Sequence, residues 1–225
     1  MIRAVVFDMD GLMIDTERMG RKVWSQIGDE MGYPVSDALY QKVLGVNETS
    51  CRRVLTDAFG ADFPCQAFRE NTAQRMEFLL QTEGVPVKPG LRALLDYLKL
   101  HGYRIAVATS TSRAPALAHL AGAHVEKDFD AVICGDMITR GKPAPDIYLK
   151  ACELLQTPPE QCMALEDSPN GIRSAHAGGL QAVMVPDLIA PTPELRAMLY
   201  ACCDDLFGVI ALLQTNPPPM SPKMK

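Results

Sequence analysis

The sequence predicts an α/β fold, a doubly wound parallel sheet with an inserted helical domain. Three observations lead to this prediction. A short apolar strand at residues 5–7 opens the chain, and residues 15–83 then contain no strand-like run. From Gly90 onwards, strand-like and helical stretches alternate. Such alternation is typical of a parallel sheet that has helices on both faces.

The inserted segment is expected to form helices because its apolar residues, such as those at 54, 55, 58 and 59, recur at helical spacing. After it we expect one helix and then further buried strands. The expected helices are 17–31, 36–44, 47–59, 64–82 and 91–100, and the later strands are 103–109, 131–134, 162–165 and 181–185.

These elements divide the chain into a core of residues 1–15 and 86–215, a helical domain of residues 16–85, and a proline-rich tail of residues 216–225. Prolines at positions 86 and 89 stiffen the segment that returns to the core. Together with residues 11–16 this segment forms a two-strand hinge. We therefore expect the helical domain to move as a lid.

Composition restricts the class of protein. With 225 residues, 48% of them hydrophobic and 22% charged, the chain is expected to be soluble, globular and able to bury a substantial core. Its longest apolar runs fall short of the ~20 residues of a membrane-spanning helix, and Arg3 and Asp8 place charge where a signal peptide would be apolar. We expect a cytoplasmic monomer with no membrane partner.

A net charge of −5 without a dense stripe of Lys and Arg argues against a nucleic-acid partner. A small anion is still compatible with this charge, because backbone N–H groups, a lysine and a metal can outweigh the global field locally. The seven cysteines have no CxxC pair and no regular spacing, and the four histidines are scattered. We interpret the cysteines as free thiols of a reducing compartment.

Two aspartates follow the first strand, in the run Phe7-Asp8-Met9-Asp10-Gly11. Carboxylates this close repel each other and resist burial, so they stabilise the fold only if a cation or a reaction uses them. Strand alternation sends both side chains to one side, and Gly11 permits a sharp turn beside them. Taken alone, the pair fits a simple Asp-Gly turn equally well.

Three later segments supply complementary chemistry: a strand that ends in Thr109-Ser110, the loop Gly141-Lys142-Pro143, and a strand that ends in Glu166-Asp167. An Asp-x-Asp pair, a strand-end Thr or Ser, a Lys and an acidic pair, in this order, resemble the four motifs of the haloacid dehalogenase superfamily of aspartate-nucleophile phosphohydrolases. The resemblance extends from Met1 to about Leu213. Four separated motifs in register are far more specific than any one of them.

The resemblance implies a Rossmann-like core with a helical cap domain and assigns roles to the motifs. Asp8 would be the nucleophile and would carry an aspartyl-phosphate, while Asp10 would act as general acid and base. Lys142, with Thr109 and Ser110, would bind the phosphoryl group, although Thr109 and Ser110 could also be helix caps. The ligands of Mg²⁺ would be Asp8, the Asp10 carbonyl and Asp167. Glu166 would support the metal or would be an ion-pair partner of Lys142.

Within the superfamily, the segments 7–17 and 183–187 look like the branch of β-phosphoglucomutase, deoxyglucose-6-phosphatase and pseudouridine-5′-phosphatase. Mutases of this branch hold a second phosphate with a histidine and cations. Here Gly20 stands at the histidine, Glu48 at or next to the loop arginine, and Ser112 at the lysine. We therefore expect a phosphatase of a small phosphorylated metabolite, of sugar phosphate or nucleoside monophosphate type.

The alternatives are a phosphomutase and, more distantly, a protein that binds a phosphometabolite without catalysis. Asp10 argues against true dehalogenases, which need no metal and lack the second aspartate. Specificity is expected to depend on a few side chains of the helical domain, and the candidates for substrate contact there are Glu17, Gly45 and Asn47.

Overall fold

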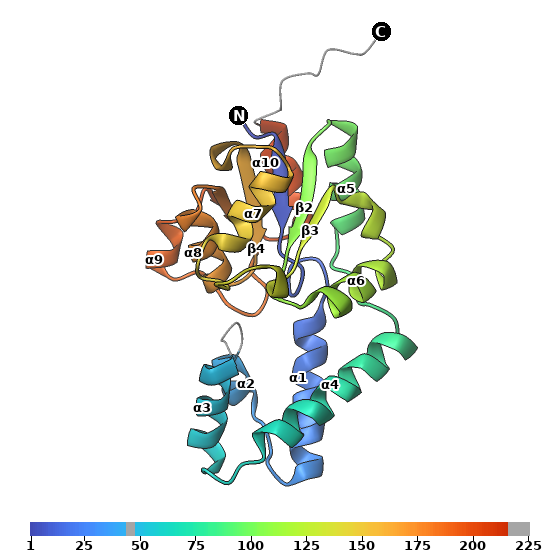
Figure 1. Cartoon of the computed structure of the whole chain (residues 1–225), viewed down its shortest axis with the longest axis vertical. Coiled ribbons are helices and arrows are strands. Elements are labelled where there is room, and N and C mark those ends of the chain that lie inside the picture. Colours follow the sequence, from blue (N-terminus) through green and yellow to red (C-terminus); the bar gives the residue numbers. More distant parts are fainter. Residues whose placement is uncertain (44–47, 216–225) are drawn as a thin grey trace. The chain divides into compact units, whose positions relative to one another are not determined.

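The structure, a computed structural model, describes residues 1–43 and 48–215. Its sheet has six strands in the order β3-β2-β1-β4-β5-β6, and every neighbouring pair is parallel (Figure 1). The predicted α/β class with a parallel sheet is confirmed. The strands are β1 (Ala4–Phe7), β2 (Arg104–Ala108), β3 (Ala131–Ile133), β4 (Cys162–Glu166), β5 (Gln181–Met184) and β6 (Ala201–Cys202).

The strands are short and apolar, as expected for a sheet that is covered on both faces. All four residues of β1 and all five of β4 are buried. The predicted strands differ from the observed ones only at their ends: Tyr103, Thr109, Cys134 and Val185 lie outside the observed strands, while β1 also includes Ala4 and β4 also includes Glu166. The edge strand β6 was not predicted. It has only two residues, too few to show an alternating pattern.

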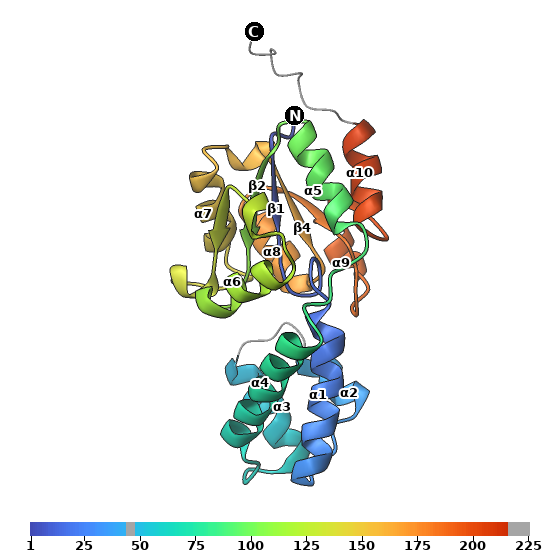
Figure 2. The same ribbon diagram turned by 90° about the vertical axis from the view of Figure 1, so that its right-hand side faces the viewer.

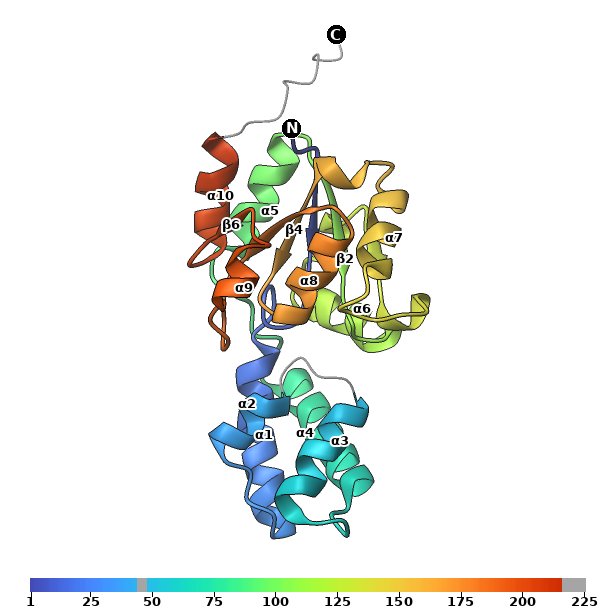
Figure 3. The same ribbon diagram turned by 90° about the vertical axis from the view of Figure 1, so that its left-hand side faces the viewer.

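Helices cover both faces of the sheet, which is the doubly wound arrangement (Figures 2 and 3). Helices α5 (Leu91–Leu100) and α10 (Leu206–Thr215) lie together on one face, and α7 (Asp146–Leu154) and α8 (Pro169–Ala177) lie on the other. The buried side of α5 follows from its sequence, since leucines 91, 94, 95 and 98 form one apolar stripe. The remaining helices of this unit are α6 (Arg113–Gly122) and α9 (Pro193–Arg196).

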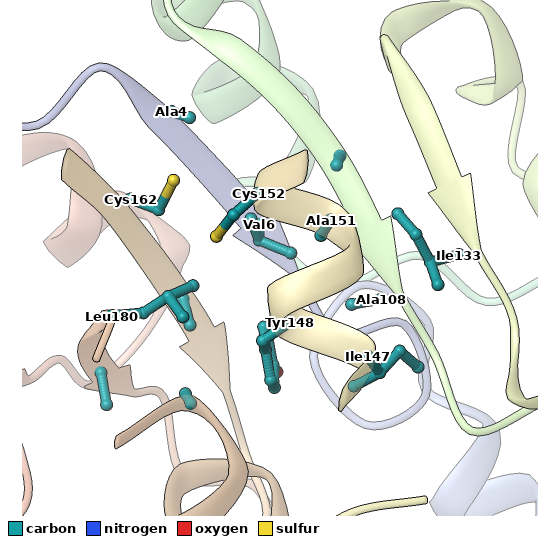
Figure 4. Packing of buried hydrophobic residues seen from close by; sticks show 14 of the residues in the cluster. Ala4, Val6, Ala108, Ile133, Ile147, Tyr148, Ala151, Cys152, Cys162 and Leu180 are labelled. Atoms are coloured by element: carbon teal, nitrogen blue, oxygen red, sulfur yellow. The ribbon is translucent and has the colours of Figure 1, made fainter. Parts of the chain in front are cut away.

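The core beneath α7 places one polar group next to the carboxyl ends of the strands. Ile147, Tyr148 and Ala151 of α7 pack towards the sheet, whose small residues Val6 and Ala108 leave room for the helix (Figure 4). The Tyr148 side chain is fully buried. A buried tyrosine needs a partner for its hydroxyl group, and that partner belongs to the site described below.

A second compact unit, residues Asp15–Val85, is separate from the core unit, which comprises Met1–Ile14 and the chain from Pro86 onwards. Its helices lie within one residue of the predicted bounds: α1 (Thr16–Met31), α2 (Asp37–Val43), α3 (Glu48–Phe59) and α4 (Cys65–Thr82). Aromatic side chains pack edge-on inside it, with ring centroids 5.1 Å apart for Trp24 and Phe68 and 4.9 Å apart for Tyr33 and Phe63. We call it the helical unit.

The two connectors are paired where they leave the core unit. Ile14 forms an antiparallel bridge with Val87, and the Lys88 N–H donates to the Met13 carbonyl at 2.9 Å. The Lys88 ammonium lies 2.8 Å from a carboxylate oxygen of Asp187, in the segment that follows β5. These contacts fix the core ends of both connectors. Among the described residues, no helix has the length and apolar character needed to cross a membrane.

Candidate active site

The sheet order reverses between β1 and β4, and the predicted motifs end the strands at this point. In an open α/β sheet, ligands bind beyond the carboxyl ends of the strands at such a reversal. Phe7 is in register with Leu165 of β4 and with Val107 of β2. Asp8 therefore emerges between the ends of two neighbouring strands, and its N–H donates to the Leu165 carbonyl at 3.0 Å.

Asp8 is a nearly buried carboxylate in contact with a single lysine. Its residue is 7% exposed, and its Oδ1 lies 2.5 Å from the Lys142 Nζ. Burial raises the pKa of the Asp8 carboxyl to about 8, although the Lys142 ammonium acts in the opposite direction. One buried cation thus offsets only part of the cost of burying this charge.

Lys142 is the centre of the site. Its Nζ donates to Asp8 Oδ1 at 2.5 Å, to Glu166 Oε1 at 2.6 Å and to the Ala108 carbonyl at 3.0 Å. These contacts use all three ammonium protons. Burial opposes the charged form, but the carboxylates of Asp8 and Glu166 outweigh it and raise the pKa of Lys142. The side chain remains a cation.

Glu166 is completely buried and is held from three sides. Besides Lys142, the Tyr148 hydroxyl donates to its Oε1 at 2.6 Å and the Ser168 hydroxyl donates to its Oε2 at 3.0 Å. Burial, and then the Glu166 charge, raise the pKa of Tyr148 well above its usual value, so the hydroxyl keeps its proton. On the fourth side, a Cβ at Gly171 would lie 1.8–2.0 Å from the carboxylate. Only glycine fits there.

The carboxylates form a potential cation site. One oxygen each of Asp8, Glu166 and Asp167 can be chosen so that all three lie within 4.8 Å of one another, and all three residues are buried. Hard divalent cations such as Mg²⁺ prefer carboxylate oxygens. When ionised, these three buried carboxyl groups would outweigh the charge of one lysine, and a divalent cation would balance the excess.

Asp10 lies against the end of β2. Its Oδ2 accepts a hydrogen bond of 3.4 Å from the Thr109 hydroxyl and one of 2.7 Å from the Thr111 hydroxyl. Gly11, with φ +84°, makes the sharp turn that the sequence predicted. Thr109 is buried, whereas the Ser110 side chain is exposed. Sequence reasoning missed Thr111, although the repeated hydroxyls of Thr-Ser-Thr at a strand end were a signal.

The structure thus brings Asp8, Asp10, Thr109, Lys142, Glu166 and Asp167 to one edge of the sheet. A model of the haloacid dehalogenase-like hydrolases matches residues 2–179. The chain belongs to this family.

Relatives of this hydrolase include named phosphatases. A phosphorylated carbohydrates phosphatase of Thermotoga maritima is 31% identical over 213 residues, which are 95% of this chain and 94% of the relative. A probable pseudouridine-5′-phosphatase of Drosophila melanogaster is 30% identical over 190 residues, 81% of this chain and 80% of the relative. The predicted branch of the superfamily is confirmed by these relatives.

Solved structures show the same fold. CbbY from Rhodobacter sphaeroides, in complex with phosphate, has a TM-score of 0.76 at 29% identity, covering 92% of this chain and 95% of that one. β-Phosphoglucomutase from Clostridium difficile also has a TM-score of 0.76, at 20% identity, covering 96% of this chain and 98% of the other. Because a structure named as a mutase has this fold, the fold alone does not decide the activity, which has to be argued from particular residues.

The helical unit contains a pocket of about 550 Å³ between α1, α3 and α4. Trp24, Leu55 and Met76 give it apolar walls, and its charged lining residues are Arg52, Arg69 and Glu70, which together carry a net positive charge. Of the residues predicted to contact substrate, Glu17 lies in the first turn of α1, while Gly45 and Asn47 lie outside the described residues. All three assignments stay predictions.

Proposed function

We propose that this hydrolase is a Mg²⁺-dependent phosphatase that cleaves a small phosphorylated metabolite through an aspartyl-phosphate on Asp8. The observation that carries the proposal is the Lys142 ammonium, which lies 2.5 Å from Asp8 and 2.6 Å from Glu166 at the carboxyl edge of the sheet. It fixes a buried carboxylate beside a permanent positive charge. This combination suits attack on a phosphoryl group, whose oxygens need neutralising.

In the first half of the reaction, an Asp8 oxygen attacks phosphorus and the bond from phosphorus to the ester oxygen breaks. Asp10 gives its proton to the leaving oxygen. In the second half, Asp10 takes a proton from water, the water oxygen bonds to phosphorus, and the bond to Asp8 breaks to release inorganic phosphate. Lys142 turns the ammonium proton that it shares with Asp8 to the phosphoryl group, and together with Thr109 it holds the phosphoryl oxygens through both halves.

The donor set fits Mg²⁺, with Asp8, the backbone carbonyl of Asp10 and Asp167 as proposed ligands. When bound, the ion would neutralise phosphoryl oxygens and keep the nucleophile ionised. We assign Glu166 a different role. Its two oxygens already accept hydrogen bonds from Lys142, Tyr148 and Ser168. Glu166 therefore positions Lys142 and supports the metal site from behind.

The organic part of the substrate is proposed to be a sugar or a nucleoside. The names of the relatives from Thermotoga maritima and Drosophila melanogaster support this class. The pocket of the helical unit, with one aromatic wall at Trp24 and two arginines, has a composition that suits a polar ring with an anionic group. A screen of purified protein against phosphorylated sugars, polyols and nucleotides, with released phosphate as readout, tests the proposed class.

Hydrolysis is proposed over phosphoryl transfer to a sugar because of position 20. A Cβ there would lie 2.6 Å from the Tyr40 hydroxyl oxygen, and this hydroxyl donates to the Glu17 carbonyl at 3.0 Å. Tyr40 is 7% exposed and its ring packs edge-on against Trp24. A side chain at position 20, where the resemblance puts the histidine of the mutases, would collide with Tyr40, and this supports the phosphatase interpretation.

A turnover assay with p-nitrophenyl phosphate and Mg²⁺ tests the proposal. Release of p-nitrophenol that stops on addition of a chelator is expected. A protein that binds phosphate but releases no p-nitrophenol, and no phosphate from the metabolite screen, would instead be a phosphometabolite-binding protein.

A further inference from the structure

The hydroxyl of Thr111 makes a shorter contact to Asp10 than the hydroxyl of Thr109 does. It donates to Asp10 Oδ2 at 2.7 Å, whereas the Thr109 hydroxyl reaches the same oxygen at 3.4 Å. A distance of 2.7 Å is optimal for an O–H···O hydrogen bond, and one of 3.4 Å is weak. Of these two threonines, Thr111 therefore makes the stronger hydrogen bond to the Asp10 carboxylate.

The backbone of Thr111 is fixed on both sides. Its N–H donates to the Thr109 hydroxyl oxygen at 3.0 Å, and its carbonyl accepts from the Gly135 N–H at 3.0 Å. Gly135 also lies close to the preceding residue, since a Cβ there would be 2.2 Å from the Ser110 carbonyl oxygen. The segment after β3 thus clamps the turn after β2. A hydroxyl group on a clamped backbone is preorganised, so its hydrogen bond costs little additional entropy.

These contacts give the hydroxyl groups of Thr109 and Thr111 different roles. A hydroxyl has one proton, so Thr109 cannot donate fully to Asp10 and to a phosphoryl oxygen at the same time. The Thr111 N–H occupies a lone pair of the Thr109 oxygen and leaves its proton available. Because Thr111 holds Asp10, Thr109 can turn its proton to the phosphoryl group without releasing the acid.

We propose that Thr111 is a positioning residue that holds the Asp10 carboxyl in line with the ester oxygen of the substrate. This inference rests on the proposed function, because it concerns the residue that protonates the leaving group. Thr111 itself touches neither phosphorus nor the leaving oxygen in this role. Its loss would misplace the acid and leave Asp8, Lys142 and the metal ligands in position.

Two esters of similar shape separate this role from general damage. p-Nitrophenolate departs without a proton, whereas the phenolate of phenyl phosphate depends much more on the acid. The value kcat/KM reports the steps up to departure of the leaving group. A misplaced acid therefore lowers kcat/KM for phenyl phosphate selectively, whereas a damaged fold or metal site lowers both values alike.

Thr111→Val keeps the shape of the side chain and removes its hydroxyl group, whereas Thr111→Ser keeps the hydroxyl group and removes the methyl group. For Thr111→Val we expect a loss of about ten-fold or more in kcat/KM for phenyl phosphate and less than about three-fold for p-nitrophenyl phosphate. Thr111→Ser should keep both values within about two-fold of the parent. Thr139→Val is the matched control, since it makes the same change at an exposed threonine of the core unit.

A double-mutant cycle adds a second readout. In an Asp10→Ala background, Thr111→Val should lower kcat/KM for phenyl phosphate by less than about two-fold, because the group it positions is gone. The inference would be overturned by equal losses of kcat/KM on both esters, by a Thr111→Ser protein with the same loss as Thr111→Val, or by additive effects in the cycle. The proposed phosphatase function would be unaffected by these outcomes. A parent protein that hydrolyses neither ester nor any metabolite of the screen would overturn both.

Discussion

At the scale of single residues, the site depends on a carboxylate that the fold buries at a cost. Asp8 has its pKa raised to about 8 by burial, although it contacts Lys142 at 2.5 Å. Burying this carboxylate costs free energy, because only one cation, Lys142, contacts it among the described residues. We therefore interpret Asp8 as a catalytic rather than a structural residue. Lys142 alone does not outweigh the burial of Asp8, and a second cation beside it would stabilise the ionised Asp8 carboxylate.

Asp8→Asn should abolish turnover and leave the fold intact, because it replaces the nucleophile by an amide of nearly the same volume. We expect kcat for p-nitrophenyl phosphate to fall by about 10³-fold or more, with loss of the phosphoryl adduct seen by intact-protein mass spectrometry. Asp10→Asn should also be severely impaired. Asp96→Asn, an exposed position on α5, is the control. Near-parental activity of Asp8→Asn with added Mg²⁺ would refute the covalent mechanism.

Metal dependence follows from the carboxylates around Asp8 and Asp167. Chelation should stop catalysis and Mg²⁺ should restore it, whereas Ca²⁺ should support it poorly because it is larger and less strict in geometry. Asp167→Ala should raise the Mg²⁺ concentration needed for half-maximal activity more than it changes any other parameter. Activity that survives a chelator, or an unchanged metal requirement in Asp167→Ala, would contradict this assignment.

At the scale of elements, the start of α8 is shaped around Glu166. The Ser168 hydroxyl caps the helix by accepting from the Gly171 N–H at 3.1 Å and also donates to Glu166. Gly171→Ala would drive a methyl group into the carboxylate, 1.8–2.0 Å away. We expect the free energy of unfolding to fall by about 3 kcal/mol and activity to be lost, because overpacking then breaks a buried ion pair.

Urea unfolding measures this change in stability, and Arg173→Ala is the matched variant on the exposed side of the same helix. In a helix, alanine itself is favourable, so the control should unfold within about 0.5 kcal/mol of the parent. A Gly171→Ala protein as stable and active as this control would show that the backbone can move away from Glu166 without cost.

The sequence sufficed for the elements with strong local patterns and failed where tertiary contacts decide. The apolar run of β1 and the leucines of α5, which recur at helical spacing, were sufficient to predict these two elements. Residues Ala201–Cys202 form β6 only because β5 offers an edge. Tyr148 lies in an apolar helix, so its sequence context indicates only a core residue. Its hydrogen bond to Glu166, 18 positions away, could not be predicted from that context.

The same limit applies within the motifs. Lys142, Glu166 and Asp167 were found because four motifs occur in order, which is information about the whole chain. Thr111 lies outside the four motifs, and its hydrogen bond to Asp10 joins residues that are 101 positions apart in the sequence. Such a contact depends on how the turn after β2 is clamped by Gly135, which only the folded chain shows.

At the scale of the whole molecule, we propose that the two compact units act in one reaction. The core unit contains the carboxylates and Lys142, and the helical unit contains Gly20 and the pocket beside Trp24. We expect the helical unit to act as a lid whose closure excludes bulk water and selects the organic group. The fate of the phosphoryl group then depends on whether the closed site can hold a second phosphate.

We expect hydrolysis to win because the positions of the mutase histidine and cations carry other residues in this sequence. Tyr40 lies beside Gly20, and the resemblance implies that Glu48 stands at or next to the loop arginine of the mutases and Ser112 at their lysine. Incubation with β-glucose 1-phosphate and a trace of glucose 1,6-bisphosphate should therefore release free phosphate with little glucose 6-phosphate, both followed enzymatically over time. Asp8→Asn protein provides the blank. Rapid accumulation of glucose 6-phosphate with little free phosphate would instead show that a sugar hydroxyl outcompetes water at the Asp8 phosphoryl group, and the protein would be a mutase.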